Sequence, residues 1–458
     1  MNIGVIGAGY VGLTLSACMA DMGHRVVCIE KDRDRLAAIR RGGLPFYEPG
    51  LLDLVAAGTR SDLLSVTNAF DAAVRSASVV FVAVGTPPEE NGDPDLSALE
   101  EAIQTLARLP HSGRVIAIKS TVPVGTTDRA GEAFAAMDNH AEVAYAPEFL
   151  SEGSAVSDFR HPHRVIIGTR HSRSAKLLTS LYQPLRCPIL VTDPRTAEMI
   201  KYASNAFLAT KVSFINQIAM VCEQVGGDIG TVATGMGLDP RIGPHFLKAG
   251  IGFGGSCLPK DTRALAALAG RHGVLSSLLD AVVAINSAQR GRFAAKIETA
   301  LGGVSGKTLA LLGLSFKGRT SDVRESPALE VAQHLLAKGA VVRAFDPAAE
   351  DPAARAVPGL VCCPDVYEAA QGADALVILT DWPEFERLDW RRLRQRVRRA
   401  VVFDGRGLRI AGPATYAGFA YTGPGMDPSS AVQPFRRNVL VRKAPRNGVS
   451  QISVNDRA

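Results

Sequence analysis

The segment 250–261 combines the residue types that a covalent catalytic centre needs. It reads Gly-Ile-Gly-Phe-Gly-Gly-Ser-Cys-Leu-Pro-Lys-Asp, and four of its first six residues are glycine. Glycine at this density lets the main chain take positive φ and lie against a ligand. Free main-chain N–H groups and the cationic Lys260 would lower the pKa of the Cys257 thiol towards the reactive thiolate. We therefore predict a nucleophilic cysteine; the alternative is a surface loop that holds a small, inert, apolar Cys257.

A dinucleotide-binding pattern lies at the other end of the chain. A predicted strand at 3–6 leads into Gly-Ala-Gly-Tyr-Val-Gly at 7–12, a helical pattern to residue 22 and a second strand that ends in Glu30. The glycines permit a tight turn, close approach of a pyrophosphate to a helix N-terminus, and close packing of helix on strand. Glu30 stands where a carboxylate accepts both ribose hydroxyls. Because it would repel a 2′-phosphate, the pattern predicts NAD rather than NADP, a preference that Lys31 and Arg35 would weaken.

Length and composition limit the class of protein. The 458 residues suggest about three domains at roughly 150 residues each. A hydrophobic share of 47% and a charged share of 21% are ordinary for a globular protein. Without an apolar run of 18 residues or a signal-peptide pattern, the sequence predicts no membrane span and a cytoplasmic location. Of the formal net charge of +6, +5 falls on residues 431–458, so the body of the chain gives no electrostatic reason to expect nucleic acid.

The cysteines argue against a disulfide framework and against a metal site. Seven are present, without a Cys-x-x-Cys pair or histidines at metal-ligand spacing, so we expect no metal. An odd number in a cytoplasmic chain favours free thiols. Cys18, Cys28 and Cys222 fall in apolar helix or strand patterns and are predicted to lie in the core.

The order of predicted elements indicates an α/β fold: two Rossmann-like, doubly wound domains joined by a helical middle domain. The expected domains are 1–195, which binds NAD; 196–301, which is helical and carries the Cys257 segment as a projecting loop; and 302–425, a second α/β block. Residues 426–458 lose periodicity and are predicted to form a disordered basic tail.

Polar residues stand at positions where such a fold binds ligands. Thr86, Thr121, Glu148 and Glu152 follow predicted strands of the first domain, at the carboxyl ends where open α/β sheets bind ligands. Lys201 and Asn205 stand four residues apart, on one face of a helix predicted over 197–225. A second long helix is predicted over 274–301.

The second α/β block offers cations instead of a glycine loop. Lys317, Arg319 and Arg324 follow its first predicted strand, and Arg406 follows a later one. Side chains of this kind hold phosphates by charge-assisted hydrogen bonds. The alternative is a solvated basic loop.

Six motifs taken together resemble the UDP-glucose/GDP-mannose dehydrogenase family over about residues 1–425. They are Gly-Ala-Gly-Tyr-Val-Gly (7–12), Tyr-Glu-Pro-Gly-Leu (47–51), Lys-Ser-Thr-Val-Pro-Val-Gly-Thr-Thr (119–127), Pro-Glu-Phe-Leu-Ser-Glu-Gly-Ser-Ala (147–155), Gly-Phe-Gly-Gly-Ser-Cys-Leu-Pro-Lys-Asp (252–261) and Arg-Glu-Ser-Pro (324–327). Members of this family oxidise a sugar C6 alcohol to a carboxylate with two NAD, without releasing the aldehyde. The resemblance is nearest to members that act on UDP-glucose, and it implies a homodimer whose core is the helical middle domain.

The resemblance implies a role for each matched catalytic residue. Cys257 would capture the aldehyde as a thiohemiacetal, which the second hydride transfer converts to a thioester. Lys201 and Asn205 would hydrogen-bond the oxygen that becomes an oxyanion. The residues around the water that deprotonates the alcohol and later hydrolyses the thioester would be Asp261, Thr121 and Glu148. Which of these three is the base stays open.

The resemblance also implies two binding sets. NAD would be bound by Gly7, Gly9, Val11, Gly12, Glu30, Arg35, Thr86, Thr121, Glu152, Lys260 and Arg324. The nucleotide sugar would be bound by Glu148, Phe149, Leu150, Ser151, Glu152, Lys201, Phe246, Leu247, Lys248, Ala249, Gly250, Gly254, Lys317 and Arg406. Arg241 would be inserted into the site of the neighbouring subunit.

Other functions stay open. GDP-mannose dehydrogenases share the Cys257 segment, whereas Asp-Gly-Arg at 404–406 and Gly-Ile-Gly-Phe at 250–253 favour UDP-glucose. UDP-N-acetylmannosamine dehydrogenases usually place a histidine before the cysteine and fit less well. A single-step hydroxyacid dehydrogenase would use Lys201 and Asn205 but would need neither Cys257 nor the third domain. The presence of every expected catalytic residue opposes a non-catalytic NAD-binding protein.

Overall fold

The computed structural model describes residues 1–109 and 113–427. By their contacts these residues form two units. The first unit comprises Met1–Thr210, Gly254–Val283 and Arg319–Glu325; the second comprises Lys211–Phe253, Ala284–Gly318 and the described residues from 326 onward. The expected domain boundaries at 195, 301 and 425 stay a prediction, and nearly all of the expected tail, residues 428–458, lies outside the described residues.

The first unit is built on an eight-stranded sheet, in the order β3-β2-β1-β4-β5-β6-β7-β8. Its strands are β1 (Asn2–Ile6), β2 (Arg25–Ile29), β3 (Leu64–Thr67), β4 (Val79–Val82), β5 (Val115–Ile118), β6 (Glu142–Tyr145), β7 (Val165–Thr169) and β8 (Ile189–Thr192). All neighbours are parallel except β6 and β7. This order, which reverses on either side of β1, confirms the predicted doubly wound sheet. The sequence did not indicate β3, β7 or β8.

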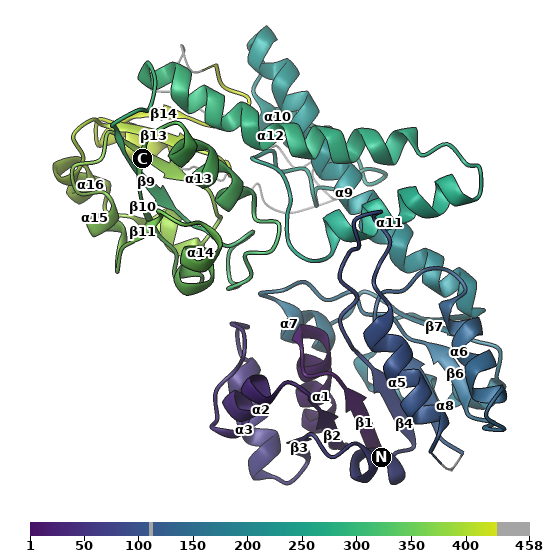
Figure 1. Ribbon diagram of the computed structural model, residues 1–458. Coiled ribbons are helices and arrows are strands. Elements are labelled where there is room, and N and C mark those ends of the chain that lie inside the picture. The colour runs from purple at the N-terminus through teal and green to yellow at the C-terminus, as the bar shows by residue number, and fades with distance from the viewer. Residues whose placement is uncertain (110–112, 428–458) are drawn as a thin grey trace, which may run out of the picture. The chain divides into compact units, whose positions relative to one another are not determined.

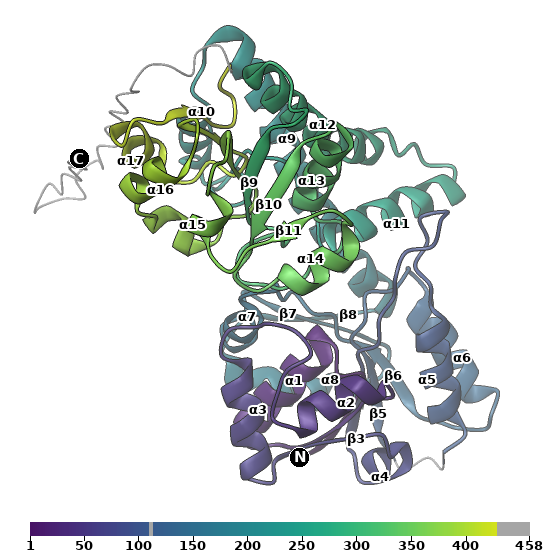
Figure 2. The same ribbon diagram turned by 60° about the vertical axis from the view of Figure 1, so that its left-hand side comes forward.

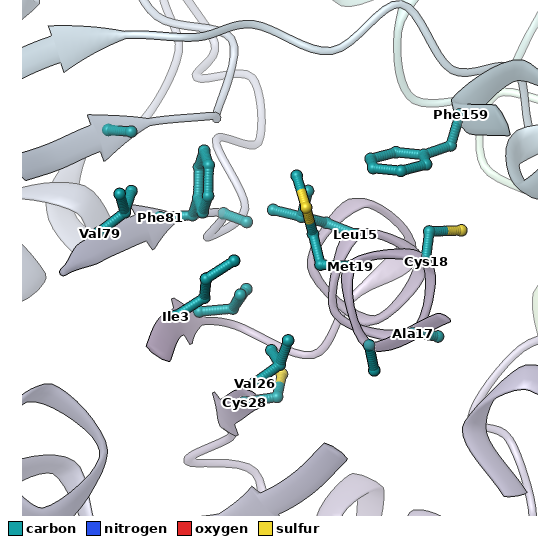
Figure 3. Packing of buried hydrophobic residues seen from close by; sticks show 14 of the residues in the cluster. Ile3, Leu15, Ala17, Cys18, Met19, Val26, Cys28, Val79, Phe81 and Phe159 are labelled. Carbon is teal, nitrogen blue, oxygen red and sulfur yellow. The ribbon is translucent and has the colours of Figure 1, made fainter. Parts of the chain in front are cut away.

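Helices cover both faces of this sheet (Figure 1). They are α1 (Tyr10–Asp21), α2 (Arg33–Arg40), α3 (Leu51–Arg60), α4 (Phe70–Arg75), α5 (Ser97–Ala107), α6 (Thr126–Ala135), α7 (Ala155–Arg160), α8 (Ser172–Tyr182) and the short η1 (Gln183–Leu185). Alternate strand residues point to opposite faces. Val79 and Phe81 therefore join one core with α1, whereas Val80 and Val82 join another with α5 and α6. Figure 3 shows Phe81 beside Leu15 and Met19 of α1 in the first core.

The second unit holds a six-stranded, wholly parallel sheet, in the order β11-β10-β9-β12-β13-β14. Its strands are β9 (Thr308–Leu312), β10 (Val341–Phe345), β11 (Val361–Cys362), β12 (Ala375–Ile378), β13 (Val401–Asp404) and β14 (Ala420–Thr422). Its helices are α13 (Pro327–Ala337), α14 (Glu350–Ala356), α15 (Val366–Ala369), η2 (Pro383–Arg387), α16 (Trp390–Arg396) and α17 (Ala411–Tyr416), some of which flank the sheet in Figure 2. The second predicted α/β block is confirmed.

Four helices lie between the two sheets in the sequence: α9 (Pro194–Val225), α10 (Ile229–Gly237), α11 (Leu258–Arg271) and α12 (Ser277–Leu301). The sequence analysis found α9 and α12 but took the stretch between them as loop. The segment 250–257 contains no helix or strand and leads into α11, of which Cys257 is the N-cap residue, and Pro259 stands in the first turn. Proline suits that position, since a first-turn N–H has no intrahelical partner.

Cys18, Cys28 and Cys222 are buried as predicted, and all seven cysteines are free thiols. Across residues 1–109 and 113–427, no helix combines the length and apolar character that crossing a membrane requires. The cytoplasmic location stays a prediction.

Candidate active site

The glycine loop after β1 has room for a ligand at one position. Gly7 has φ of 98°, and a Cβ there would lie 2.7 Å from the carbonyl oxygen of Ala83. A Cβ on Gly12 would lie 1.8 Å from the carbonyl oxygen of Gly7, so both glycines are fixed by close approach of the main chain. A Cβ on Gly9 would meet nothing within 4 Å. The space in front of Gly9, at the start of α1, is therefore where the loop fits the pyrophosphate of a dinucleotide.

Glu30 is fixed beside this loop. Its buried carboxylate accepts hydrogen bonds from the main-chain N–H of Ala8 at 3.0 Å and of Asp32 at 2.9 Å. Arg35 donates to the same carboxylate at 3.1 Å. The other nearby cation, Lys31, pairs with Glu101 instead. Glu30 thus follows β2 directly, as expected, and the Arg35 guanidinium is already paired with its carboxylate.

Four predicted catalytic residues form two buried pairs along one face of α9. Lys201 Nζ donates to Glu148 at 2.9 Å, and Asn205 Nδ2 donates to Asp261 at 2.6 Å. None of the four is more than 7% exposed. The pairs join α9 to the segment after β6 and to the first turn of α11, so residues far apart in the sequence meet at one site.

The charges around Cys257 correct the expected thiol chemistry. Burial raises the pKa of the Cys257 thiol to about 11, and the carboxylates of Glu148 and Asp261 raise it further than Lys201 lowers it. The prediction of a lowered pKa is wrong chiefly because the thiol is buried, and the ammonium of Lys260, which was expected to lower the pKa, bonds Asp261. The resting thiol is therefore protonated at neutral pH.

The charged state of the first pair is well defined. Burial acts to raise the pKa of Glu148, but Lys201, the N–H of Leu150 and Lys119 together outweigh it, and the pKa lies below its ordinary value. Burial acts to lower the pKa of Lys201, but Glu148, Cys257 and Asp261 together raise it. Both groups are therefore ionised at neutral pH.

Lys119 is a third buried cation, to which the sequence analysis gave no role. Lys119 directly follows β5, and its Nζ donates to the carbonyl oxygen of Pro147 at 3.0 Å and to the hydroxyl of Tyr182 at 3.3 Å. Burial lowers its pKa to about 8, while Glu148 acts in the opposite direction. Because Lys119 bonds the carbonyl oxygen of Pro147, the residue before Glu148, it helps to fix the main chain that positions Glu148. The sequence could have indicated a buried lysine here, because Lys119 directly follows an all-apolar strand.

Further predicted residues of the first unit make hydrogen bonds at two strand ends and at Glu152. The Thr86 hydroxyl donates to the carbonyl oxygen of Thr121 at 3.1 Å, which fixes two strand ends together. Glu152 accepts hydrogen bonds from Ser256 Oγ at 3.3 Å and from Arg324 Nη2 at 3.4 Å. Arg324 also makes a two-point ion pair with Asp322.

The basic loop of the second α/β block is divided in the structure. Arg319 and Arg324 belong to the first unit, whereas Lys317 belongs to the second. A phosphate site that includes these cations stays a prediction. Thr320, which lies between Arg319 and Arg324 in the sequence, contacts both Tyr10 and Glu152 of the first unit through its hydroxyl.

Arg406 binds main-chain carbonyl groups. Its Nε, Nη1 and Nη2 donate to the carbonyl oxygens of Leu379, Gly252 and Phe316 at 2.7, 3.0 and 2.8 Å. The sequence analysis expected a side chain directed at the substrate. In the structure the guanidinium joins the segment before Lys317 to the segment 250–253, both in the second unit, and a contact of Arg406 with the substrate stays a prediction.

The segment 250–253 is held from three sides within the second unit. Asn216 of α9 accepts the N–H of Gly250 at 2.8 Å. Asn286 of α12 accepts the N–H of Phe253 at 2.8 Å and donates to its carbonyl oxygen at 3.0 Å. Arg290, one turn further along α12, donates to the same oxygen at 3.0 Å. None of these three polar residues was identified from the sequence, because nothing local marks them.

Glycine is required at residue 252 by this arrangement. Gly252 has φ of 100°, and a Cβ there would lie 2.6 Å from Asn286 Oδ1. We expect Gly252→Ala to lower stability by about 2–4 kcal/mol and the melting temperature by about 5–15 °C. Gly291→Ala on α12, the helix that carries Asn286, is the control, since a Cβ there meets nothing within 4 Å and alanine favours a helix. Calorimetry that showed equal melting temperatures for the two variants would contradict this reading.

The remaining predicted residues are placed as follows. The Phe149 ring lies between the guanidinium of Arg164 at 3.9 Å and Lys201 at 5.1 Å. The N–H groups of Leu150 and Ser151 are bound by Glu148 and Asp158. In the second unit Phe246 is exposed with φ of 63°, Leu247 and Ala249 are buried, and Lys248 is exposed. Arg241 is exposed and pairs with Asp239 of its own chain. In the described part of the chain, no group of three or more His, Cys, Asp or Glu could hold a metal ion.

Comparisons with known proteins agree with the site. The three models of the UDP-glucose/GDP-mannose dehydrogenase family match in order: the NAD binding domain at 1–186, the central domain at 195–288 and the UDP binding domain at 310–409. The UDP-glucose 6-dehydrogenase TuaD of Bacillus subtilis is 42% identical over 442 residues, 94% of this chain and 95% of its own. A UDP-glucose 6-dehydrogenase of Rhizobium meliloti is 43% identical over 434 residues, 93% of this chain and 99% of its own.

A solved structure shares the fold. A UDP-glucose dehydrogenase of the archaeon Pyrobaculum islandicum superposes with a TM-score of 0.85 at 37% identity, covering 93% of this chain and 97% of its own. The glycine loop, the doubly wound sheet and these matches define an NAD-dependent oxidoreductase. Within that class, the chain belongs to the UDP-glucose/GDP-mannose dehydrogenase family.

Proposed function

We propose that this protein oxidises UDP-glucose at C6 to UDP-glucuronate in two successive hydride transfers. The observation that carries the proposal is the placement of Cys257 at the N-terminus of α11, among the buried pairs Lys201–Glu148 and Asn205–Asp261. A single oxidation of an alcohol needs a base but no thiol. A thiol beside a buried ammonium suits a reaction that captures an aldehyde and stabilises its oxygen.

The first half of the proposed reaction converts the alcohol to an aldehyde. NAD, when bound, supplies the hydride acceptor. Asp261, Glu148 or Thr121 would direct the water that takes the proton from the C6 hydroxyl. Because Glu148 is ionised and paired with Lys201, the proton that leaves the C6 hydroxyl could be accepted within this ion pair. Lys201 and Asn205 would donate to the oxygen on which negative charge develops.

The second half passes through covalent bonds to Cys257. The sulfur adds to the aldehyde carbon to give a thiohemiacetal, and loss of its hydride leaves a thioester. Water then adds to the thioester carbonyl and the thiolate leaves, which releases the carboxylate. The thiol tethers the intermediate throughout, so that no free aldehyde escapes.

The groups that would hold NAD are preformed around the glycine loop. Gly9 faces open space at the start of α1, where Val11 would also contact NAD, and the Glu30 carboxylate would accept the ribose hydroxyls. Thr86, Thr121, Glu152, Lys260 and Arg324 would complete the site, as the family resemblance implies. Arg35 would contact the ribose side, where it already pairs with Glu30.

The nucleotide sugar would be held by Lys317 and the segment 246–250, with residues 148–152 at the sugar. UDP-glucose is favoured over GDP-mannose because the relatives and the solved structure reported above carry UDP-glucose in their names. Asp-Gly-Arg at 404–406 agrees with this choice. The test is the rate of NADH formation with UDP-glucose, GDP-mannose and UDP-N-acetylmannosamine; a preference for either of the last two would replace the proposed substrate.

A homodimer is supported by an apolar stripe on α9. Phe207, Phe214, Val221 and Val225 are 64%, 45%, 52% and 73% exposed, at the seven- and four-residue spacings of one helix face. Apolar side chains in such a row favour burial against a second copy. Arg241, exposed and bound by a single carboxylate, would then enter the partner's site. Sedimentation that gave a monomer at micromolar concentration would contradict the dimer.

Cofactor choice should follow Glu30. We expect kcat/KM with NAD to exceed that with NADP by about 10²-fold or more, because the buried carboxylate repels a 2′-phosphate. Glu30→Gln should reduce the ratio of kcat/KM with NAD to kcat/KM with NADP, since it removes the negative charge of Glu30 and leaves Arg35 without that partner. Steady-state kinetics with both cofactors measures this. Equal efficiencies in the unmodified protein would mean that Arg35 or Lys31 decides instead.

Lys317 should affect the binding of the sugar nucleotide and leave the binding of NAD nearly unchanged. We expect Lys317→Ala to raise KM for UDP-glucose about 10- to 150-fold, the loss of about 1.5–3 kcal/mol that one charge-assisted bond contributes. KM for NAD should stay within about twofold, since Lys317 lies in the second unit. Arg406→Ala is a poorer probe because it also frees three carbonyl groups. A larger effect of Lys317→Ala on NAD would reverse the assignment of the two nucleotide sites.

A further inference from the structure

The Cys257 thiol has a hydrogen-bonded route for its proton. Its Sγ lies 3.6 Å from Ser256 Oγ, within hydrogen-bond distance for sulfur. Ser256 Oγ in turn lies 3.3 Å from Glu152 Oε1, to which it donates. Because the Ser256 hydroxyl donates to Glu152, its oxygen is left to accept a hydrogen bond from the thiol. The three groups form a continuous chain within the first unit.

A route is needed because the site opposes a free thiolate. With a pKa of about 11, the thiol is ionised in about one molecule in 10⁴ at pH 7. Thiolate is the form that attacks carbon. The proton must therefore leave as the sulfur–carbon bond forms, and a nearby acceptor would lower the barrier to this step.

In the described structure the other two carboxylates of the site accept hydrogen bonds from neither Cys257 nor Ser256. Glu148 Oε1 accepts from Lys201 and its Oε2 from the N–H of Leu150. Asp261 Oδ2 accepts from Asn205 and its Oδ1 from Lys260. Their negative charges also raise the pKa of the thiol instead of lowering it. Glu152 is the carboxylate that is connected to the sulfur through a hydroxyl.

We propose that Ser256 is a catalytic proton relay between Cys257 and Glu152. As the sulfur bonds to the aldehyde carbon, the S–H proton passes to Ser256 Oγ and the hydroxyl proton of Ser256 passes to Glu152 Oε1. The carbonyl electron pair moves to the oxygen, and no proton is exchanged with solvent. When hydrolysis of the thioester expels the thiolate, the same two transfers run backwards and restore the resting state. The relay rests on the proposed function of Cys257.

The surroundings of Glu152 suit an acceptor that returns its proton. Its Oε2 accepts from the Thr320 hydroxyl at 3.3 Å, and Thr320 Oγ1 lies 2.7 Å from the hydroxyl of Tyr10. Arg324 Nη2 also contacts Oε1, which favours the ionised carboxylate. The Glu152 carboxylate is held in place by groups on both oxygens. These contacts direct Oε1 at Ser256.

The test uses the resting protein without substrate or cofactor. Alkylation of Cys257 by iodoacetamide is followed between pH 5.5 and 9.5, with peptide mass spectrometry to separate it from the other thiols. An internal relay moves the proton without using solvent, so the rate for the unmodified protein should become independent of pH below about pH 8. Ser256→Ala and Glu152→Gln should lose this plateau, and their rates should fall about tenfold for each unit of pH.

Glu152→Gln separates the relay from simple electrostatics. Removing a negative charge near a thiol lowers its pKa, which alone would speed alkylation. The relay predicts slower alkylation below pH 8 instead. Ser276→Ala is the matched control, since that serine bonds only Asp280 at the surface in the described structure, and it should keep the plateau.

The outcomes separate the relay from the proposed function. A tenfold fall per pH unit in the unmodified protein, or a plateau that survives Ser256→Ala and Glu152→Gln, would overturn the relay while the role of Cys257 stands. Full turnover of UDP-glucose by Cys257→Ala would overturn the proposed function whatever the plateau shows. If Ser256→Ala does not fold, Glu152→Gln gives the same test.

Discussion

Cys257→Ala is expected to lose formation of UDP-glucuronate by about 10⁴-fold or more, the scale on which removal of a catalytic nucleophile acts. The aldehyde has no second hydride to give until a nucleophile adds to its carbonyl, and water adds more slowly than a thiolate held in place. The variant should still reduce added UDP-6-aldehydo-glucose with NADH, because that reaction is the reverse of the first half and needs no thiol. Stopped-flow absorbance at the NADH band measures both reactions.

Cys257→Ser gives the matched control for this prediction. The serine oxygen can add to the aldehyde, but its ester should hydrolyse far more slowly because an alkoxide is a poorer leaving group than a thiolate. Intact-mass analysis after incubation with UDP-glucose and NAD should therefore show a sugar nucleotide attached to the protein. Rates of the unmodified enzyme in Cys257→Ala would remove the thiol from the mechanism.

Lys201→Met is expected to have the second largest effect, on both turnover and stability. Loss of one oxyanion donor lowers kcat by about 10²–10³-fold. Breaking a buried pair by removing one partner costs about 3–5 kcal/mol of folding free energy, because Glu148 is left buried without its nearest cation. The double variant Lys201→Met/Glu148→Gln should recover much of the stability and none of the turnover. Thermal melting and steady-state kinetics of the three proteins measure these effects.

The pH dependence of this loss has a definite sign. In the unmodified protein the pKa of Glu148 lies below its unfolded value, so its pairing stabilises the fold above about pH 4.5 and is lost as the pH falls through the folded pKa. Without Lys201, burial should raise the pKa of Glu148 above its unfolded value. Protonation then stabilises the variant, so its deficit in melting temperature should be smaller at pH 5 than at pH 8. An equal deficit at both values would mean that Glu148 is not the group left unpaired.

The features that the sequence predicted are local ones. The glycine loop and Glu30 are read from about 30 contiguous residues, because turn, helix and strand follow one another in space as they do in the chain. Lys201 and Asn205 were placed on one face by their spacing alone. The two sheets followed from runs of apolar residues bounded by glycine and polar residues.

The features that the sequence missed depend on residues that meet only in the fold. Glu148 lies 53 residues from Lys201, and Asp261 lies 56 from Asn205, so neither pair could be read from spacing. Lys260 seemed in the sequence to activate Cys257, yet in the helix its side chain bonds Asp261, and the thiol pKa rises. The carbonyl oxygens that Arg406 binds come from three separate segments, which no local pattern joins.

The most direct test of the account is the number of NADH formed for each UDP-glucose consumed. The reaction is run to completion with limiting UDP-glucose and excess NAD, in the presence of a hydroxylamine trap for aldehydes. The account predicts two NADH per sugar, one UDP-glucuronate and no trapped aldehyde, because Cys257 holds the intermediate until it is a carboxylate. One NADH per sugar with a trapped aldehyde would contradict it, since the protein would then be a single-step alcohol dehydrogenase in which Cys257 takes no part.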